Sequence, residues 1–185
     1  ALLEKVARGV AFAHEHGVVH RDLKPTNVVL DHEGEPKIMD FGLARLEGEK
    51  TRLTVSGALL GTPVYMAPEQ VQGKAAGPAT DVYTLGVMLY QALTGQVPFL
   101  GETSGELFAK ILCDEPRRPT SSGKGVPREL EIVCLKAMEK ECHRRYGSAL
   151  EFAEDLRCWR EGDPIRARPS GWMTRVSKRV RRNPA

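Results

Sequence analysis

The residues with the clearest chemical potential lie in two short stretches near the start of the chain. The first, residues 20–27, reads His-Arg-Asp-Leu-Lys-Pro-Thr-Asn, and the second, residues 40–42, reads Asp-Phe-Gly. Asp22 offers a carboxylate that can accept a proton, and Lys24 offers an ammonium group that can neutralise phosphate. Asn27 and Asp40 offer the hard oxygen atoms that Mg²⁺ prefers. Together these groups suit phosphoryl transfer from a magnesium-bound nucleotide, which depends on positioning and charge neutralisation.

Each residue taken singly has an ordinary interpretation as a turn residue, a surface acid or a loop residue without a partner. The order along the chain favours function, because Asp40 follows Asp22 by eighteen positions and two further features come later. These are the segment 61–69, Gly-Thr-Pro-Val-Tyr-Met-Ala-Pro-Glu, and Asp81. From Ala1 to about Trp159 the sequence resembles the eukaryotic-like (Hanks-type) protein serine/threonine kinases of the bacterial receptor type.

The resemblance implies a role for each of the four polar residues. Asp22 would orient the substrate hydroxyl and accept its proton, as the catalytic residue. Lys24 would neutralise the γ-phosphate of ATP, and a lysine at this place is typical of serine/threonine rather than tyrosine kinases. Asn27 and Asp40 would bind Mg²⁺, with Mn²⁺ as an alternative ion.

Neighbouring residues would support this site. By resemblance, Val29 would lie under the adenine ring of ATP, and Phe41 would pack below as a spine residue. Gly42 permits the sharp backbone turn that follows the aspartate. His20 and Arg21 are expected to have structural or regulatory roles.

The later residues resemble a substrate-docking segment and its supports. Thr62 would contact the catalytic aspartate and lysine. Glu69 would pair with Arg145 and fix the shape of the segment, and Arg144 is an alternative partner. Asp81 would hold the backbone of the catalytic loop, although it could instead cap a helix that starts one residue later.

Kinases with an arginine before the catalytic aspartate often pair it with a phosphate on the activation segment. Arg21 occupies that position, and the candidate phosphorylation sites are Thr51, Thr54 and Ser56. Thr54 and Ser56 match the bacterial pattern best, because they precede Thr62 by eight and six residues. The alternative is an unmodified polar loop.

Hydrophobic periodicity predicts the elements that must position these groups. Apolar residues at helical spacing predict a helix over 2–16, which Gly17 ends. Short strands at 28–30 and 36–39 form a hairpin with polar residues at both ends, which brings Asn27 and Asp40 together. Further helices are expected from near Ala79 to Gly95, around 107–112, over 130–138, and from a capping box formed by Ser148 and Glu151. The fold class is therefore mainly α, a kinase-like C-terminal lobe with a small β-hairpin, assigned to residues 1–160.

Composition excludes several classes of protein. Apolar residues make up 41% and charged residues 28% of the chain, a composition typical of globular proteins. The net charge is +3. The four cysteines form no Cys-x-x-Cys pair, and no histidine pair has metal spacing, so neither a disulfide framework nor a zinc site is expected. No signal peptide is visible.

A complete kinase also needs a glycine-rich loop, a strand lysine and a helix glutamate, and this sequence contains none of them. The chain begins with Ala and opens directly in a helical pattern. We therefore expect a fragment whose N-terminal lobe, absent here, is supplied in cis, and which has negligible activity alone. Protein serine/threonine kinase is the predicted function. The alternative is a non-catalytic pseudokinase or scaffold. Pseudokinases commonly lose the catalytic or the metal-binding aspartate, whereas this sequence has both, as Asp22 and Asp40.

The C-terminal end is basic, with nine Lys or Arg and two acidic residues from Arg157 onward. Residues 164–169 predict an extended linker, and 170–182 predict a basic amphipathic helix. We assign 161–185 to a juxtamembrane linker, because it resembles the segment before the membrane span of bacterial receptor-type kinases. This implies an anionic membrane surface as partner, a location on the cytoplasmic side, and homodimerisation. A solvated helix is the alternative, and no motif supports specific nucleic-acid binding.

Overall fold

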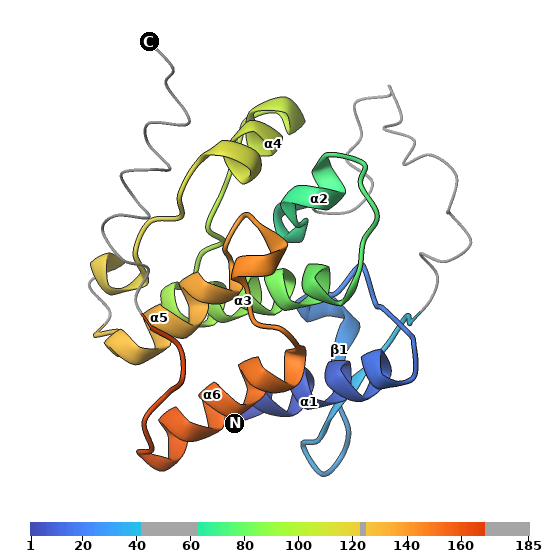
Figure 1. Cartoon of the computed structure of the whole chain (residues 1–185), viewed down its shortest axis with the longest axis vertical. Helices are drawn as coiled ribbons and strands as arrows, with labels where there is room; N and C mark the ends of the chain where they lie inside the picture. Colours follow the sequence, from blue (N-terminus) through green and yellow to red (C-terminus); the bar gives the residue numbers. More distant parts are fainter. Residues whose placement is uncertain (42–62, 123–124, 169–185) are drawn as a thin grey trace.

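The computed structural model of the 185-residue chain describes residues 1–41, 63–122 and 125–168 (Figure 1). These residues form helices and one two-stranded antiparallel sheet. In chain order the elements are α1 (Leu2–Glu15), η1 (Pro25–Asn27), β1 (Val28–Leu30), β2 (Pro36–Ile38), η3 (Pro63–Tyr65), α2 (Pro68–Val71), α3 (Pro78–Thr94), α4 (Ser104–Cys113), η4 (Pro119–Ser122), α5 (Arg128–Ala137), η5 (Cys142–Arg144) and α6 (Ala149–Glu161). The prediction of a mainly helical lobe with a small hairpin is confirmed.

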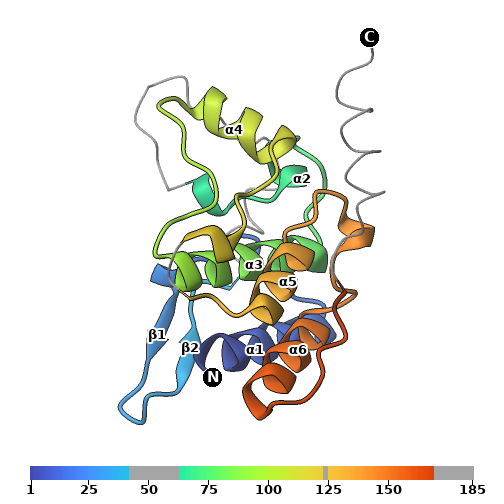
Figure 2. The same ribbon diagram turned by 90° about the vertical axis from the view of Figure 1, so that its left-hand side faces the viewer.

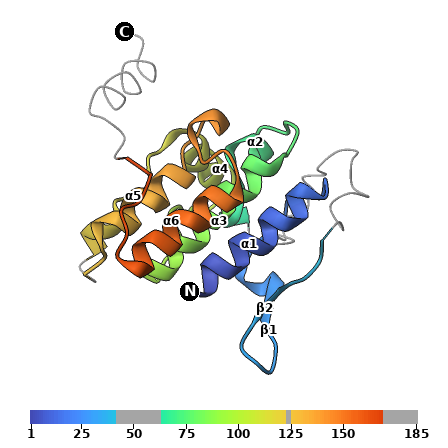
Figure 3. The ribbon, with the colours of Figure 1, turned by 60° about the horizontal axis from the view of Figure 1, so that its bottom comes forward.

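Helix α3 runs through the middle of the lobe and organises the other helices around it (Figure 1). Helices α1 and α6 pack against each other on one side of α3, and α2 and α4 lie on the other side. Helix α5 packs against both α3 and α6 (Figure 2). The β-hairpin lies beside α1 and projects from the body of the lobe (Figure 3).

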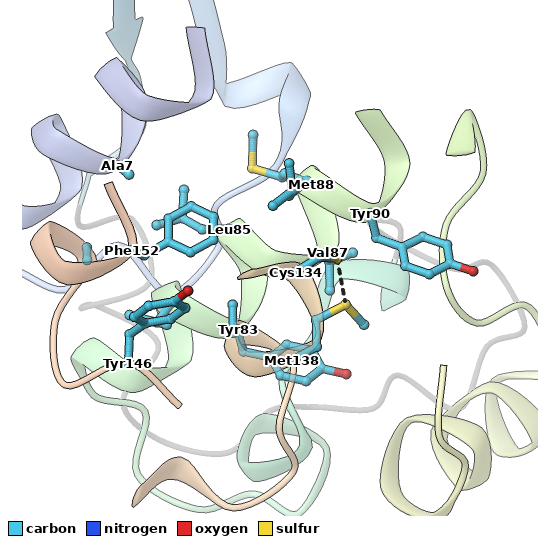
Figure 4. Packing of buried hydrophobic residues seen from close by; sticks show 14 of the residues in the cluster. Ala7, Tyr83, Leu85, Val87, Met88, Tyr90, Cys134, Met138, Tyr146 and Phe152 are labelled. Atoms are coloured by element: carbon cyan, nitrogen blue, oxygen red, sulfur yellow. Dashed lines mark hydrogen bonds between the residues drawn. The ribbon is translucent and has the colours of Figure 1, made fainter. Parts of the chain in front are cut away.

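The central position of α3 follows from its sequence. Apolar side chains occur on every face of α3, and Tyr83, Leu85 and Val87 are fully buried. A helix that is apolar all round is stable only inside a core. Figure 4 shows Leu85 and Val87 packed among side chains from α1, α5 and α6, including Phe152. Gly95, at φ 76°, ends the helix in the left-handed conformation that favours glycine.

The predicted hairpin forms in antiparallel register, with Val28 opposite Ile38 and Leu30 opposite Pro36. The second strand ends one residue earlier than predicted, at Ile38. Beyond the strand, the amide of Met39 donates to the carbonyl of Asn27 (2.8 Å). This bond closes the open end of the hairpin between residues 27 and 39, next to the polar residues Asn27 and Asp40.

The start of α6 differs from the predicted capping box. Ser148 is the N-cap, and its hydroxyl accepts the amide hydrogen of Glu151 (3.1 Å), as expected. The carboxylate of Glu151, however, accepts from the amide of Gly147 (2.9 Å), one residue before the N-cap. One of the two hydrogen bonds of a capping box therefore forms. In place of the second, the Glu151 carboxylate binds Gly147, the residue before the N-cap.

The segment after α6 stays on the lobe as far as Ala167, which is 5% exposed. Asp155 of α6 is completely buried, and its carboxylate accepts from the amides of Arg166 (2.7 Å) and Ala167 (2.9 Å). The hydroxyl of Tyr146 donates to the same carboxylate (2.8 Å). These bonds hold the segment predicted to be an extended linker against α6, seven residues beyond the expected boundary. Within the described part of the chain no helix is long and apolar enough to cross a membrane.

The contact between α3 and α5 depends on the absence of a side chain at Gly86. A Cβ there would lie 2.8 Å from both the Cβ of Ala137 and the Cγ of Met138. We expect Gly86→Ala to lower the free energy of unfolding by about 1–3 kcal/mol, because the core is overpacked. Urea denaturation measures this.

The matched control for that change is Gly105→Ala in α4. A Cβ at position 105 would meet only the hydroxyl oxygen of Thr103, at 3.9 Å. We expect this variant to be as stable as the parent or more stable by about 0.5–1 kcal/mol, because alanine favours a helix interior over glycine. Equal losses in the two variants would contradict the close α3–α5 contact.

Candidate active site

The carboxylate of Asp81 holds the start of the 20–27 loop. Asp81 lies in the first turn of α3, is fully buried, and accepts hydrogen bonds from the amides of His20 (2.8 Å) and Arg21 (2.8 Å). Helix α3 begins at Pro78, so the alternative that Asp81 caps a helix starting one residue later is wrong. A buried carboxylate with two amide donors fixes the loop backbone at this point.

The buried imidazole of His20 joins the loop to the end of the hairpin. The amide of Asp22 donates to Nδ1 of His20 (3.3 Å), so Nε2 carries the hydrogen and donates to the carbonyl of Met39 (2.9 Å). The ring also lies against that of Phe41, with centroids 4.8 Å apart. One side chain thus sets the spacing between the loop and residues 39–41.

Asp22 and Lys24 form a polar pair at the solvent side of the loop. The Nζ of Lys24 lies 2.7 Å from a carboxylate oxygen of Asp22, whose side chain is 64% exposed. Asn27 is buried, and its amide nitrogen donates to the main-chain carbonyl of Asp22 (2.8 Å). Because the nitrogen makes this bond, the amide oxygen is the atom that Asn27 can offer to a cation. The pair Asp22–Lys24 can accept a proton and face an anionic group at the same place.

Asp40 and Asn27 are the two oxygen donors at the mouth of the hairpin. The bond between Met39 and Asn27 places Asp40 one residue beyond the closed end of the hairpin. Asp40 is exposed and has a φ of 62°, a left-handed conformation that is uncommon for residues other than glycine. One carboxylate and one amide oxygen suit Mg²⁺, which usually takes one or two protein carboxylates and completes its shell with phosphates and water. In the described ranges no cluster of three or more His, Cys, Asp or Glu residues could hold a metal ion.

A buried ion pair joins helix α2 to the residue that follows η5. The guanidinium of Arg145 binds both carboxylate oxygens of Glu69, each at 2.7 Å. Its remaining hydrogens go to the carbonyls of Ala79 (2.7 Å), Glu139 (2.7 Å) and Lys140 (3.0 Å), so all five guanidinium donors are used. Arg144, the alternative partner, instead lies 3.9 Å from a carboxylate oxygen of Glu141.

The pair also sets the charge state of Glu69. Burial raises the pKa of this carboxyl, but the hydrogen bonds and charge of Arg145 and the hydroxyl of Thr80 (2.8 Å) together lower it below the ordinary value. Glu69 is therefore ionised when it faces Arg145. Burial raises the pKa of the nearby Tyr83 hydroxyl, whose ring lies under the Arg145 guanidinium at 5.0 Å.

Large apolar side chains of the hairpin and its ends are exposed. Val29, expected to lie under an adenine ring, is 41% exposed, and Leu30, Met39 and Phe41 are comparably open. Apolar side chains gathered on one projecting element commonly mark a surface that meets a ligand or another domain. Several predicted residues lie outside the described ranges, namely Gly42, Thr51, Thr54, Ser56, Thr62 and the basic segment 170–182.

Two further residues at this site carry no signal in the sequence. His14, four turns along α1, places Nε2 2.7 Å from the carboxylate of Asp81. Gln70, next to Glu69, donates to the carbonyl of Arg21 (2.7 Å). Both contacts join residues about fifty or more positions apart, so only the folded chain brings them together.

Comparisons with known proteins show which family this sequence resembles. Residues 1–156 match the family model described as protein kinase domain. Serine/threonine-protein kinase PknB of Mycobacterium leprae is 34% identical over 166 residues, covering 90% of this chain and 27% of that protein. PknB of Mycolicibacterium smegmatis is 36% identical over 156 residues, covering 84% and 25%. PknB of Mycobacterium tuberculosis is 34% identical over 167 residues, covering 90% and 27%. The chain spans about a quarter of the length of these relatives.

Proposed function

The chain belongs to the protein kinase domain family, and we propose that it supplies the catalytic and metal-binding half of a serine/threonine kinase of the bacterial Hanks type. The reaction is transfer of the γ-phosphoryl group of ATP to serine or threonine hydroxyls of protein substrates. The observation that carries this proposal is the closed hairpin. Through the Met39–Asn27 bond and the His20 imidazole, it brings Asp40 to the loop that holds Asp22 and Lys24.

The residues of this chain divide the work of the reaction. Asp22 orients the substrate hydroxyl and takes its proton as the oxygen bonds to the γ-phosphorus and the bond to the bridging oxygen of ADP breaks. Lys24 neutralises charge on the transferred group. Asn27 and Asp40 would hold Mg²⁺, and the ion would offset the negative charge of the phosphates. Val29 and Phe41 form an apolar floor beneath the adenine ring.

We also propose that the exposed apolar side chains of the hairpin meet an N-terminal lobe. Leu30, Met39 and Val29 are each more than 40% exposed, and the sequence contains no glycine-rich phosphate loop to complete an ATP site. We therefore expect this chain alone to transfer phosphate negligibly, and the upstream-extended protein to be the active form.

Regulation by a phosphate facing Arg21 is part of the proposal. The Nε of Arg21 is buried and has no hydrogen-bond partner among residues 1–41, 63–122 and 125–168. A guanidinium in that condition suits a phosphate group. Thr51, Thr54 and Ser56 are the candidate sites. For the basic segment 170–182 we propose contact with an anionic membrane surface on the cytoplasmic side, because its sequence combines positive charge with apolar residues at helical spacing. We propose homodimerisation only from the resemblance to receptor-type kinases.

The direct test is phosphotransfer from ATP to a generic basic protein by the upstream-extended protein. We expect incorporation on serine and threonine that stops when EDTA removes Mg²⁺ and returns when Mg²⁺ is restored, because Asn27 and Asp40 act through the ion. Mn²⁺ is expected to replace it. A folded protein that transfers no phosphate with either ion would favour the non-catalytic scaffold. Robust transfer by the 185-residue chain alone would contradict the need for a second lobe.

A further inference from the structure

We propose that Gln70 is a positioning residue for Asp22, an inference that rests on the proposed kinase function. The side-chain amide of Gln70 bridges two main-chain groups. Its nitrogen donates to the carbonyl of Arg21 (2.7 Å), and its oxygen accepts from the amide of Ala67 (2.9 Å). The amide thus joins the residue just before the proposed base to the start of α2.

The carbonyl that Gln70 binds belongs to the same planar peptide group as the amide of Asp22. Fixing the carbonyl of Arg21 therefore fixes the plane from which the Cα of Asp22 extends. The opposite end of that group is held too, because the amide of Asp22 donates to the His20 ring (3.3 Å). Two side chains from distant parts of the chain thus set the orientation of one peptide.

This peptide needs such support because Arg21 has a φ of 69°. A left-handed conformation is unfavourable for a residue with a side chain, and it persists only where the surroundings determine it. The peptide before Arg21 is fixed by Asp81, which accepts from the Arg21 amide (2.8 Å). The peptide after Arg21 is fixed by Gln70. Without Gln70 the peptide after Arg21 would keep only the longer bond from the Asp22 amide to the His20 ring (3.3 Å).

Gln70 also connects the proposed base to the buried ion pair. It follows Glu69, which Arg145 holds through two bonds of 2.7 Å. A shift of α2 would therefore move the Gln70 amide that donates to the Arg21 carbonyl. The Asp22 carboxylate would move with that carbonyl. The contact joins helix α2 to the loop that carries Asp22.

The competing role for Gln70 is that of a helix cap alone, because its oxygen accepts from Ala67 at the start of α2. Gln70→Glu separates the two roles. A glutamate keeps an acceptor for the Ala67 amide, but it has no hydrogen to donate to the Arg21 carbonyl and sets a negative charge beside it. Gln72→Glu, on the exposed residue after the same helix, is the matched charge control.

In the upstream-extended protein we expect Gln70→Glu to lower kcat about 10-fold or more, because a buried carbonyl loses its donor and the loop relaxes. KM values for Mg²⁺-ATP and for the protein substrate should change little, whereas the urea midpoint should fall modestly below that of Gln72→Glu, because one carbonyl loses its hydrogen-bond donor. Hydrogen exchange should become faster at the amides of Arg21 and Asp22. Gln72→Glu should behave as the parent in every measurement.

Two outcomes would overturn the inference. One is a kcat for Gln70→Glu equal to that of Gln72→Glu, and the other is unchanged hydrogen exchange over residues 20–23. If the parent protein itself transfers no phosphate, the proposed function fails, and hydrogen exchange alone decides whether Gln70 positions the peptide. Faster exchange then supports the contact, and unchanged exchange rejects it.

Discussion

Replacing Asp22 by Asn in the upstream-extended protein is expected to lower kcat by roughly 10²–10⁴-fold, the usual contribution of a positioned general base. The asparagine has the same shape and keeps an oxygen for the Lys24 ammonium, which lies 2.7 Å from the Asp22 carboxylate. It cannot take the proton of the substrate hydroxyl. The main chain of position 22 keeps its bonds to Asn27 (2.8 Å) and His20 (3.3 Å), and the weak side-chain contact with Asn27 (3.5 Å) can be made by the asparagine oxygen.

The measurement is the initial rate of phosphate transfer at saturating Mg²⁺-ATP, with nucleotide affinity determined separately. Affinity should be nearly unchanged, since Asn27 and Asp40, the proposed metal ligands, are intact. Asp114→Asn, on the exposed residue that follows α4, is the control and should keep full activity. A rate for Asp22→Asn above one tenth of the parent would remove Asp22 from the role of base.

The second large effect is expected on stability, from Arg145→Met. This change leaves the carboxylate of Glu69 buried and unpaired, and also removes the donors for three main-chain carbonyls. Breaking a buried ion pair from one side costs about 3–5 kcal/mol in the free energy of unfolding. Urea denaturation of the purified chain measures the loss. Arg144→Met should have little effect, because Arg144 is partly exposed and lies 3.9 Å from the carboxylate of Glu141, a weak surface pair.

The charge of Glu69 is responsible for part of that loss, and a second substitution isolates it. In Glu69→Leu/Arg145→Met neither member of this buried pair carries a charge, so we expect the double variant to be more stable than Arg145→Met alone. A double variant less stable than the single would mean that the contacts Glu69 keeps without Arg145, such as the bond from Thr80, outweigh the cost of the stranded carboxylate.

The same pair predicts a dependence on pH with a definite sign. The pKa of Glu69 in the folded chain lies below its ordinary value, so the pair stabilises the fold fully above the unfolded pKa of about 4.3. This stabilisation is lost as the pH falls through the lowered folded pKa. The difference in stability between the parent and Arg145→Met should therefore shrink on acidification. A difference independent of pH would contradict an ionised Glu69.

The sequence by itself determined the local elements and the chemical class of the site. Two short apolar runs around the turn residues 31–34 predicted the hairpin, and the all-round apolar character of residues 79–94 predicted a buried helix, because both patterns depend only on near neighbours along the chain. The order of Asp22, Lys24, Asn27 and Asp40 indicated phosphoryl transfer, since that reaction needs those groups whatever surrounds them. The short helices at 63–65, 68–71 and 119–122 gave no comparable period, because one turn of helix is too short to show one.

Only the tertiary structure decided which partners the polar groups take. The sequence left Asp81 as either a helix cap or an anchor of the loop, and the packing of α3 beneath residues 20 and 21 makes it the anchor. Gln70 and Arg21 are forty-nine positions apart, and Glu69 and Arg145 seventy-six. A side-chain hydrogen bond depends on distances of a few tenths of an ångström, which follow from how whole helices pack and not from spacing along the chain. The residue types fixed what chemistry is available, and the packing fixed which backbone groups hold it in place.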